Sequence, residues 1–295
     1  MHFLRAWLRA CLLTLAAGMA ALAAAAHAGT IEGAQFKSSV LGRNWAFNVY
    51  LPTGYDPNGP LRYPVLYLLH GGGGDRNDWV MQGRIKKTAD ALIEAGQIPP
   101  AIIVMPDAGT TWYVDLRERV ESAFFLELIP VIEKSYRALG TRDARVIAGL
   151  SMGGYGALRF VLQYPDKFQA AALLSPAIYT PEPPENSGAR TARVFALPGS
   201  DGSYSPEMWK AYNYPSLWDA FLRKGIQVPI YINSGDDDEF YIEAEAARLY
   251  SLLRRNRQPA ELRIVNGKHE WAVWESTAAD ALKYVFQNVR RPQAQ

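Results

Sequence analysis

Apolar segments of two kinds alternate along the chain, and this alternation restricts the fold more than any other feature of the sequence. Short continuous runs such as PVLYLLH (64–70) and AIIVMPD (101–107) have the length of strands that are buried on both faces of a sheet. Segments such as RIKKTADALIEAG (84–96) have apolar residues at the spacing of a helix. Strands that alternate with helices predict an α/β fold, in which helices cover both faces of a mostly parallel sheet.

The same alternation continues toward the C-terminus. Residues 45–52 alternate between apolar and polar and predict an early, half-buried strand. Further strands are expected at residues 144–150, 169–177, 228–235 and 260–267, and further helices at residues 121–139, 152–165, 238–256 and 274–289. Pro130 is expected to bend the first of these helices. Residues 176–215 are rich in Pro, Gly, Ser and aromatic residues without a clear period, and predict an irregular insertion above the carboxyl edge of the sheet.

Residues 1–28 have the pattern of a secretory signal peptide. Arg5 and Arg9 precede a long apolar run that ends in Ala26-His27-Ala28, and we expect cleavage after Ala28. The alternative is an uncleaved membrane anchor, since the apolar run approaches the length that spans a bilayer. Cys11 lies inside the run and not at its exit, which does not favour a lipoprotein. Residues 29–295 then predict a single α/β domain.

The mature chain, residues 29–295, has a composition that excludes several functions. Removal of residues 1–28 takes away the only cysteine, so neither a disulfide nor thiol chemistry is available. It also reduces Lys and Arg from 31 to 29, which equals the 29 Asp and Glu, so the formal net charge is zero. A neutral balance gives no reason to expect a nucleic acid or an anionic membrane surface as partner, and we expect no stable membrane insertion after cleavage. Of the four histidines, only His70 and His269 remain.

The segment VIAGLSMGGYGAL (146–158) contains the main chemical motif. Gly149 to Gly153 fit G-x-S-x-G, between an expected strand and an expected helix. This is the context of a nucleophile elbow, in which a tight, strained turn holds the serine hydroxyl of Ser151 at the edge of the sheet. The simpler alternative is a tight turn that only requires small residues.

A serine hydroxyl needs a base, and the base needs a carboxylate. His269 is the only histidine after Ser151, and it follows the last expected strand. The carboxylate should come from a strand end between them, where the run Asp236–Glu239 follows residues 228–235. This run also suits the N-terminus of the next helix. Calcium is a weaker alternative because the spacing lacks an EF-hand pattern, and spacing alone does not select one aspartate.

Backbone N–H groups are expected to stabilise the oxyanion of an acyl-transfer reaction. One belongs to Met152, directly after the nucleophile, and a second should come from the loop after an early strand. The stretch LLHGGGGDRNDW (68–79) has that place, and its glycines allow close approach to a ligand. His70 then organises this loop. No G-K-[ST] follows the glycines, which excludes a phosphate loop, and we expect neither a cofactor nor a metal.

With these residues the chain resembles the esterase D or putative esterase family of α/β-hydrolases. The matching stretches are LLHGGGGDRNDW, VMPDAGTTWYVD, IAGLSMGGYGAL, YPDKFQAAALLSPA, SGDDDEFY and GKHEWAVW. The resemblance implies Ser151 as nucleophile, His269 as base and Asp238, three residues past Gly235, as the acid. It also implies Gly72 as the first oxyanion donor. The least similar part is residues 176–215, which should hold much of the specificity.

The family includes S-formylglutathione hydrolases, tributyrin-type, feruloyl and acetylxylan esterases, and the antigen 85 mycolyltransferases. The resemblance implies a serine esterase for short-chain, feruloyl or acetyl esters, and the signal-peptide pattern of residues 1–28 predicts that it is exported, to the periplasm or outside the cell. The alternatives are an acyltransferase of the mycolyltransferase type and a non-catalytic binding protein of the same fold. Aromatic residues in loops near the strand ends are candidates for stacking on sugar or phenolic groups of a small or carbohydrate-linked substrate: Trp79, Trp112, Tyr113 and Trp271. Trp274 is expected in the core, and the oligomeric state is not indicated.

Overall fold

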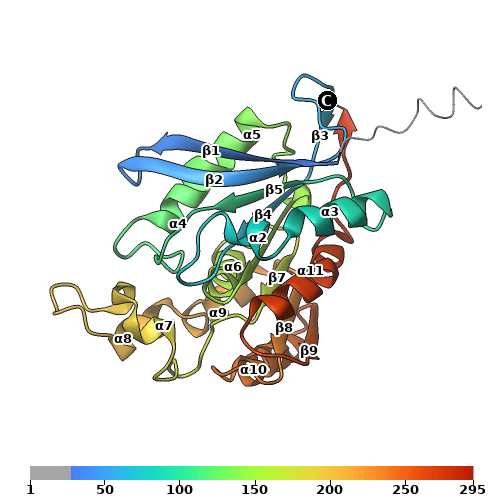
Figure 1. The fold of residues 1–295 in the computed structure, drawn as a ribbon. Helices are drawn as coiled ribbons and strands as arrows, with labels where there is room; N and C mark the ends of the chain where they lie inside the picture. The colour runs from blue at the N-terminus through green and yellow to red at the C-terminus, as the bar shows by residue number, and fades with distance from the viewer. Residues whose placement is uncertain (1–27, 295) are drawn as a thin grey trace, which may run out of the picture.

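A twisted eight-stranded sheet forms the centre of the molecule in the computed structural model, which describes residues 28–294. The strand order is β1-β2-β5-β4-β6-β7-β8-β9 (Figure 1). The strands are β1 (Thr30–Ser38), β2 (Arg43–Leu51), β4 (Val65–Leu69), β5 (Ile102–Pro106), β6 (Arg145–Leu150), β7 (Ala171–Leu174), β8 (Ile230–Gly235) and β9 (Ala260–Val265). Strand β2 runs antiparallel to β1 and β5, and the other neighbours in this sheet pair in parallel. The mostly parallel sheet predicted from the apolar runs is confirmed.

Helices cover both faces of the sheet (Figure 1). One face packs against α3 (Ile85–Glu94) and α11 (Trp271–Phe286). The other packs against α4 (Val120–Ala123), α5 (Ile129–Ser135), α6 (Met152–Gln163), α9 (Pro215–Lys224) and α10 (Ile242–Arg255). Alternate residues of each strand enter opposite cores, as in β4, where Tyr67 faces α4 and Leu66 faces α3. Burial on both faces explains why these strands are continuous apolar runs.

Strand β1 was not predicted from the sequence. Most of its side chains are partly or fully exposed, so its hydrophobic pattern is weak. It pairs with β2 over all nine of its residues, from Thr30 opposite Leu51 to Ser38 opposite Arg43. Main-chain hydrogen bonds with β2 therefore hold this edge strand in place. Such bonds leave no pattern of apolar residues in the sequence, so the strand could not be predicted from one. At the other end of the chain, β10 (Gln293–Ala294) pairs with the short strand β3 (Leu61–Arg62).

The helix expected at residues 121–139 is interrupted near its proline. A π-helical turn, η1 (Phe124–Leu128), joins α4 to α5, and Pro130 lies in the first turn of α5. Proline has no N–H to donate to the preceding turn, and its ring crowds that turn. The wider π turn, which ends two residues before Pro130, accommodates this defect, and the expected bend itself stays a prediction.

The insertion at residues 176–215 has more structure than the sequence predicts. It contains α7 (Gly188–Thr191), the 3-10 turn η3 (Arg193–Phe195) and α8 (Pro206–Tyr212), which lie together at one end of the molecule (Figure 1). Trp209 is fully buried and stacks on Tyr155 of α6 at 5.6 Å between ring centroids. Most of residues 176–215 still lie outside helices and strands, as expected, and buried aromatic residues join the short helical segments to the core on the side of α6.

The insertion is also bonded to α6. The hydroxyl of Tyr155 and Nη1 of Arg159 each donate to the main-chain carbonyl of Tyr212, at 2.6 Å. Arg159 in turn pairs with Glu121 of α4 at 2.9 Å, and both side chains are almost fully buried. A buried charge is tolerated when it is paired and hydrogen-bonded in this way. Helix α6, which begins directly after Ser151, therefore also holds the insertion in place.

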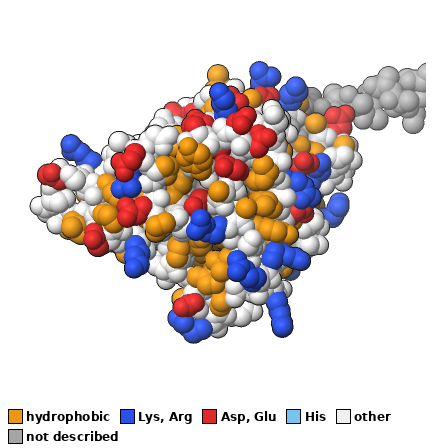
Figure 2. All heavy atoms as spheres, turned by 90° about the horizontal axis from the view of Figure 1, so that it is seen from below, with side chains coloured by type: hydrophobic (Ala, Val, Ile, Leu, Met, Phe, Trp, Pro, Cys, Tyr) orange, Lys and Arg blue, Asp and Glu red, His pale blue; other side chains and the backbone are white. Residues whose placement is uncertain are grey.

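The surface between these elements is mixed. On the face in Figure 2, acidic, basic and hydrophobic side chains are interspersed. Large exposed hydrophobic side chains include Met81 of α2 (Asp78–Met81) and Tyr241. In the part of the chain that the structure describes, no helix has the length and apolar character needed to cross a membrane. The expected signal peptide, residues 1–28, lies outside the described residues except for Ala28.

Close packing around α6 makes one glycine indispensable. A Cβ on Gly153 would lie 2.6 Å from the main-chain oxygens of Leu69 and His70, which cannot move without disturbing β4. We therefore expect Gly153→Ala to lower the free energy of unfolding by about 1–3 kcal/mol, the usual cost of overpacking. Denaturant unfolding followed by far-UV circular dichroism measures this change.

The matched control is Gly188→Ala at the first residue of α7, where a Cβ would meet no atom within 4 Å. Alanine also suits a helix better than glycine, so this variant should be as stable as wild type to within about 0.5 kcal/mol. Equal stability of the two variants would contradict the packing argument.

Candidate active site

Ser151 occupies a strained turn between β6 and α6. Its backbone angles are φ 52° and ψ −116°, a conformation that residues with a side chain rarely adopt. Such a conformation costs about 1–3 kcal/mol and persists only where the surroundings enforce it. A Cβ on Gly149 would lie 2.3 Å from the oxygen of Gly153, and one on Gly154 would lie 2.9 Å from Cα of Pro176. The small residues of the motif are therefore required by the turn itself.

His269 links the serine to a carboxylate. It lies between β9 and α11, and its Nε2 is 2.9 Å from Oγ of Ser151. Its Nδ1 is 2.8 Å from Oδ2 of Asp238, whose side chain is fully buried. An ionised carboxylate only accepts hydrogen bonds, so Nδ1 of the neutral ring carries the proton and Nε2 is free to accept the serine proton. The structure thus brings together the three side chains that the resemblance implies.

The acidic run divides its tasks among neighbouring positions. Besides facing His269, Asp238 accepts a bond from the N–H of Phe240 at 3.0 Å. The carboxylate of Asp236 accepts the N–H of Gly267 at 3.0 Å, and Glu239 accepts the N–H of His269 at 3.1 Å. The run therefore supplies one carboxylate to the imidazole and others to the loop that carries it. Within residues 28–294, no group of three or more His, Cys, Asp or Glu is arranged to hold a metal ion.

Two aromatic side chains hold the imidazole ring from the sides. The rings of Phe240 and Trp274 lie edge-on to that of His269, with centroids 4.9 and 5.0 Å away. The indole N–H of Trp274 donates to Oγ of Ser175 at 3.0 Å, which fixes the indole in turn. Trp274 is buried, so its expected place in the core is confirmed. The roles of Phe240 and Ser175 were missed, although Phe240 stands only two residues past Asp238 and could have been found there.

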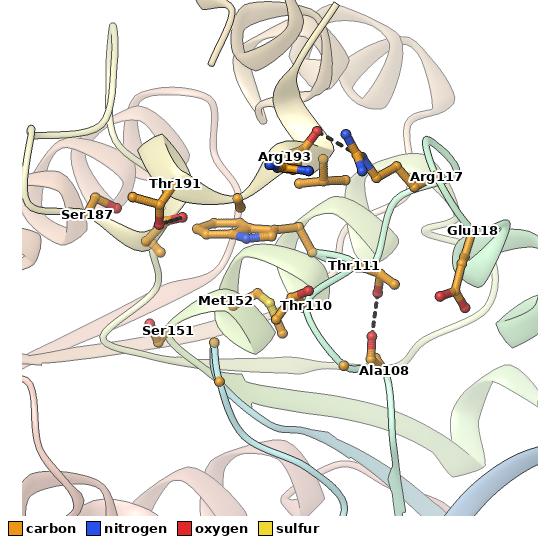
Figure 3. A pocket seen from close by; sticks show the side chains of 18 of the residues that line it. Ala108, Thr110, Thr111, Arg117, Glu118, Ser151, Met152, Ser187, Thr191 and Arg193 are labelled. Atoms are coloured by element: carbon orange, nitrogen blue, oxygen red, sulfur yellow. Dashed lines mark hydrogen bonds between the residues drawn. The ribbon is translucent and has the colours of Figure 1, made fainter. Parts of the chain in front are cut away.

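A cavity of about 730 Å³ opens in front of Ser151 and His269 (Figure 3). The glycine loop and Met152 form the wall beside the serine, with Gly72 among the lining residues. The other walls come from two longer segments, the loop 107–118 that follows β5 and the insertion residues 177–194. Figure 3 shows Ser151 and Met152 on one side of this space and Arg117 and Arg193 on the other. The insertion thus borders the cavity, as its expected position above the carboxyl edge requires.

The aromatic candidates have different positions. Trp112 lines the cavity and is 5% exposed, with its ring packed against Tyr155, Phe195 and Trp209. It has a positive φ of 54°, so the loop holds this side chain at some cost in backbone energy. One of the aromatic candidates therefore lies where a substrate can contact it.

The remaining candidates lie away from the cavity wall. Trp79 is buried, donates its indole N–H to the carbonyl of Leu69 and meets the ring of Trp271 edge-on at 5.3 Å. Tyr113 is buried and donates its hydroxyl to the carbonyl of His70 at 3.1 Å. None of these three residues lines the cavity: Trp79 and Tyr113 are buried, and Trp271 is partly exposed at the start of α11.

His70 ties the glycine loop to the loop after β5. Its Nδ1 lies 2.8 Å from the carbonyl of Gly71, and its Nε2 accepts the N–H of Ala108 at 3.0 Å. Because a backbone N–H can only donate, Nε2 is unprotonated and the ring is the neutral Nδ1–H tautomer. Burial lowers the pKa of His70 below its usual range. The side chain therefore organises the loop, as its position in the sequence indicates.

Comparison with known proteins agrees with this fold. Residues 38–285 match the family described as "Putative esterase". An endo-1,4-beta-xylanase/feruloyl esterase of Xylanibacter ruminicola is 37% identical over 163 residues, which are 52% of this chain and 22% of that protein. An acetyl esterase of Caldicellulosiruptor saccharolyticus is 28% identical over 237 residues, 75% of this chain and 82% of that protein.

Solved structures give the same picture. A ferulic acid esterase superposes with a TM-score of 0.74 at 28% identity, covering 88% of this chain and 97% of that chain. The architecture is the α/β-hydrolase fold, shared with esterases among the solved structures. The chain belongs to the putative esterase family. Its match spans only about a fifth of the length of the Xylanibacter protein.

The neutral state of His70 predicts a pH dependence of stability. Unfolded histidine takes up a proton below about pH 6.5, whereas His70 in the folded protein resists it. The stabilisation is therefore complete above about pH 6.5 and is lost as the pH falls toward the lower folded pKa. We expect wild type to lose more unfolding free energy between pH 7 and pH 5 than His70→Gln does. Chemical denaturation at both pH values measures the difference, and parallel losses in the two proteins would contradict it.

Proposed function

We propose that the protein is an exported serine esterase, a carboxylic-ester hydrolase that forms an acyl-enzyme on Ser151. The observation that carries this proposal is the chain of contacts from Asp238 through His269 to Ser151, which ends at the cavity. Membership of the putative esterase family supports the same chemistry.

The geometry supports a two-step reaction. Oγ of Ser151 attacks the ester carbonyl carbon while its proton passes to Nε2 of His269, and Asp238 stabilises the imidazolium that forms. The imidazolium gives this proton to the departing alcohol as the ester bond breaks. Water then attacks the acyl-enzyme, with His269 again accepting and returning a proton, and the carboxylic acid leaves.

The oxyanion of each tetrahedral intermediate needs preorganised donors. We assign the backbone N–H groups of Met152 and Gly72 to this role, since both residues line the cavity with Ser151. A Cβ on Gly72 would meet no atom within 4 Å, which leaves room for a substrate beside its backbone. The bonds of His70 to Gly71 and Ala108 support the loop in this position.

We propose short-chain acyl, acetyl or feruloyl esters as substrates. The similarities to a feruloyl esterase and an acetyl esterase support this choice. Trp112 on the cavity wall offers an aromatic edge to a planar phenolic group or a sugar. The pattern of residues 1–28 supports export, and N-terminal sequencing of protein recovered from an expressing bacterium tests cleavage after Ala28.

Substrate class can be tested with purified protein that starts at Gly29. The panel contains 4-nitrophenyl acyl esters, methyl ferulate and acetylated xylan, assayed in buffer alone and with an added sugar alcohol as acceptor. Release of free acid in buffer alone supports a hydrolase. Product formation that requires the acceptor would instead favour an acyltransferase, and no turnover of any ester would contradict the proposal.

Substitution of the nucleophile should abolish turnover. We expect Ser151→Ala to lower kcat by roughly 10⁴-fold or more while the protein stays folded, because no other group can form the acyl-enzyme. Labelling by a fluorophosphonate probe should be lost at the same time. A folded variant with more than a tenth of wild-type activity would exclude this role for Ser151.

The acidic run offers an internal comparison. Asp238→Asn should lower kcat strongly, by a factor on the order of 10⁴, because an amide in place of the carboxylate favours the wrong tautomer of His269. Asp237 is exposed and Asp236 bonds only to the loop, so Asp237→Asn and Asp236→Asn should be mild. Initial-rate kinetics of the three variants on one 4-nitrophenyl ester test this order. A large loss of kcat in Asp237→Asn would show that the acid is Asp237 and that its assignment to Asp238 is wrong.

A further inference from the structure

Two arginines stand on the cavity wall across from Ser151. Arg117 comes from the loop after β5 and Arg193 from η3 of the insertion, and both line the cavity (Figure 3). Nε of Arg117 donates to the main-chain carbonyl of Arg193 at 3.0 Å. This bond joins the two wall segments and fixes the guanidinium group of Arg117 against the main chain of Arg193. The esterase chemistry at Ser151 does not use either of them.

The charges of these arginines are not neutralised by a partner. A third arginine of the lining, Arg43, pairs with Glu118 through Nε at 3.0 Å and Nη2 at 2.7 Å. Within residues 28–294, no carboxylate oxygen lies within 4.0 Å of the side-chain nitrogens of Arg117 or Arg193. Asp107, the other acidic residue of the lining, accepts the N–H of Gly109. The far end of the cavity is therefore positive.

Asp201 lies in the field of Arg193 but does not cancel it. Hydrogen bonds from Ser203 are the main cause of the lowered pKa of Asp201, and attraction to Arg193 contributes least. Asp201 is fully exposed, so water screens this attraction. The N–H groups of Arg193 remain available to a ligand in the cavity.

We propose that Arg117 and Arg193 bind a carboxylate of the substrate, so that the preferred ester carries an anionic group away from its reacting carbonyl. This inference rests on the proposed esterase function and specifies its substrate class. Guanidinium groups donate pairs of N–H bonds that match the two oxygens of a carboxylate, and bonds between ionised partners are the stronger ones. A neutral ester gains nothing at this end of the cavity, so the arginines act on specificity and not on the chemical step.

Matched pairs of esters that differ in one carboxylate test the proposal. For the acyl side the pair is the 4-nitrophenyl monoester of glutarate and 4-nitrophenyl pentanoate. For the alcohol side it is 3-acetoxybenzoate and phenyl acetate. We expect wild type to have the higher kcat/KM for the anionic ester in at least one pair, and that pair shows on which side of the ester bond the carboxylate lies.

The variants are Arg117→Gln and Arg193→Gln, with Lys210→Gln as the matched control. Lys210 is an exposed cation of α8 in the same insertion and does not line the cavity, so its removal changes the net charge equally. Each arginine variant should lower kcat/KM for the preferred anionic ester about tenfold and change the neutral ester less than about twofold. Lys210→Gln should behave as wild type, and added NaCl should reduce the anionic preference of wild type.

Several outcomes overturn the proposal. These are a wild type that prefers the neutral ester in both pairs, one that hydrolyses neither anionic ester, and arginine variants that match Lys210→Gln. Turnover of the neutral esters keeps this failure separate from that of the proposed function. If wild type hydrolyses none of the esters, the proposed esterase function fails, whereas if only the anionic preference is missing, the arginine site fails alone.

Discussion

The strained backbone of Ser151 is the constraint on which the rest of the site depends. A φ of 52° is unfavourable for serine, and the surrounding chain enforces it by close contact. Gly149 and Gly153 approach so closely that a single methyl group on either would overlap main-chain atoms. Strand β4, strand β6 and helix α6 therefore meet at one point without side chains between them. Everything that acts on the serine hydroxyl is positioned relative to this point.

The electrostatic design follows from that geometry. Asp238 is buried, and its two carboxylate oxygens contact the imidazole of His269 and the N–H of Phe240. Its charge therefore directly faces the imidazole. The other histidine, His70, is kept neutral by burial and serves as a bridge between loops. Two residues of the same type thus have different surroundings: His269 contacts the side chains of Asp238 and Ser151, whereas the ring nitrogens of His70 contact the main chain of two loops.

Much of this arrangement could be predicted from the sequence, and the exceptions have physical reasons. Continuous apolar runs identify the buried parallel strands because both of their faces are covered, whereas β1 is half exposed and leaves no such pattern. The G-x-S-x-G motif predicts Ser151 as the nucleophile, and His269 is predicted as the base because it is the only histidine that follows Ser151. Composition does not reveal side-chain direction, which is why Trp79 and Tyr113 were expected at the cavity and lie in the core.

The attachment of the insertion to α6 has a consequence for how this protein can diversify. Tyr155 and Arg159 both donate to the carbonyl of Tyr212, a main-chain group that every amino acid supplies. Substitutions along the insertion can therefore change the cavity wall without removing the main-chain carbonyl through which α6 binds the insertion. The cavity wall can thus vary in sequence while this acceptor stays bonded to the helix that follows Ser151, where the ring of Tyr212 adds a cation–π contact with Arg159.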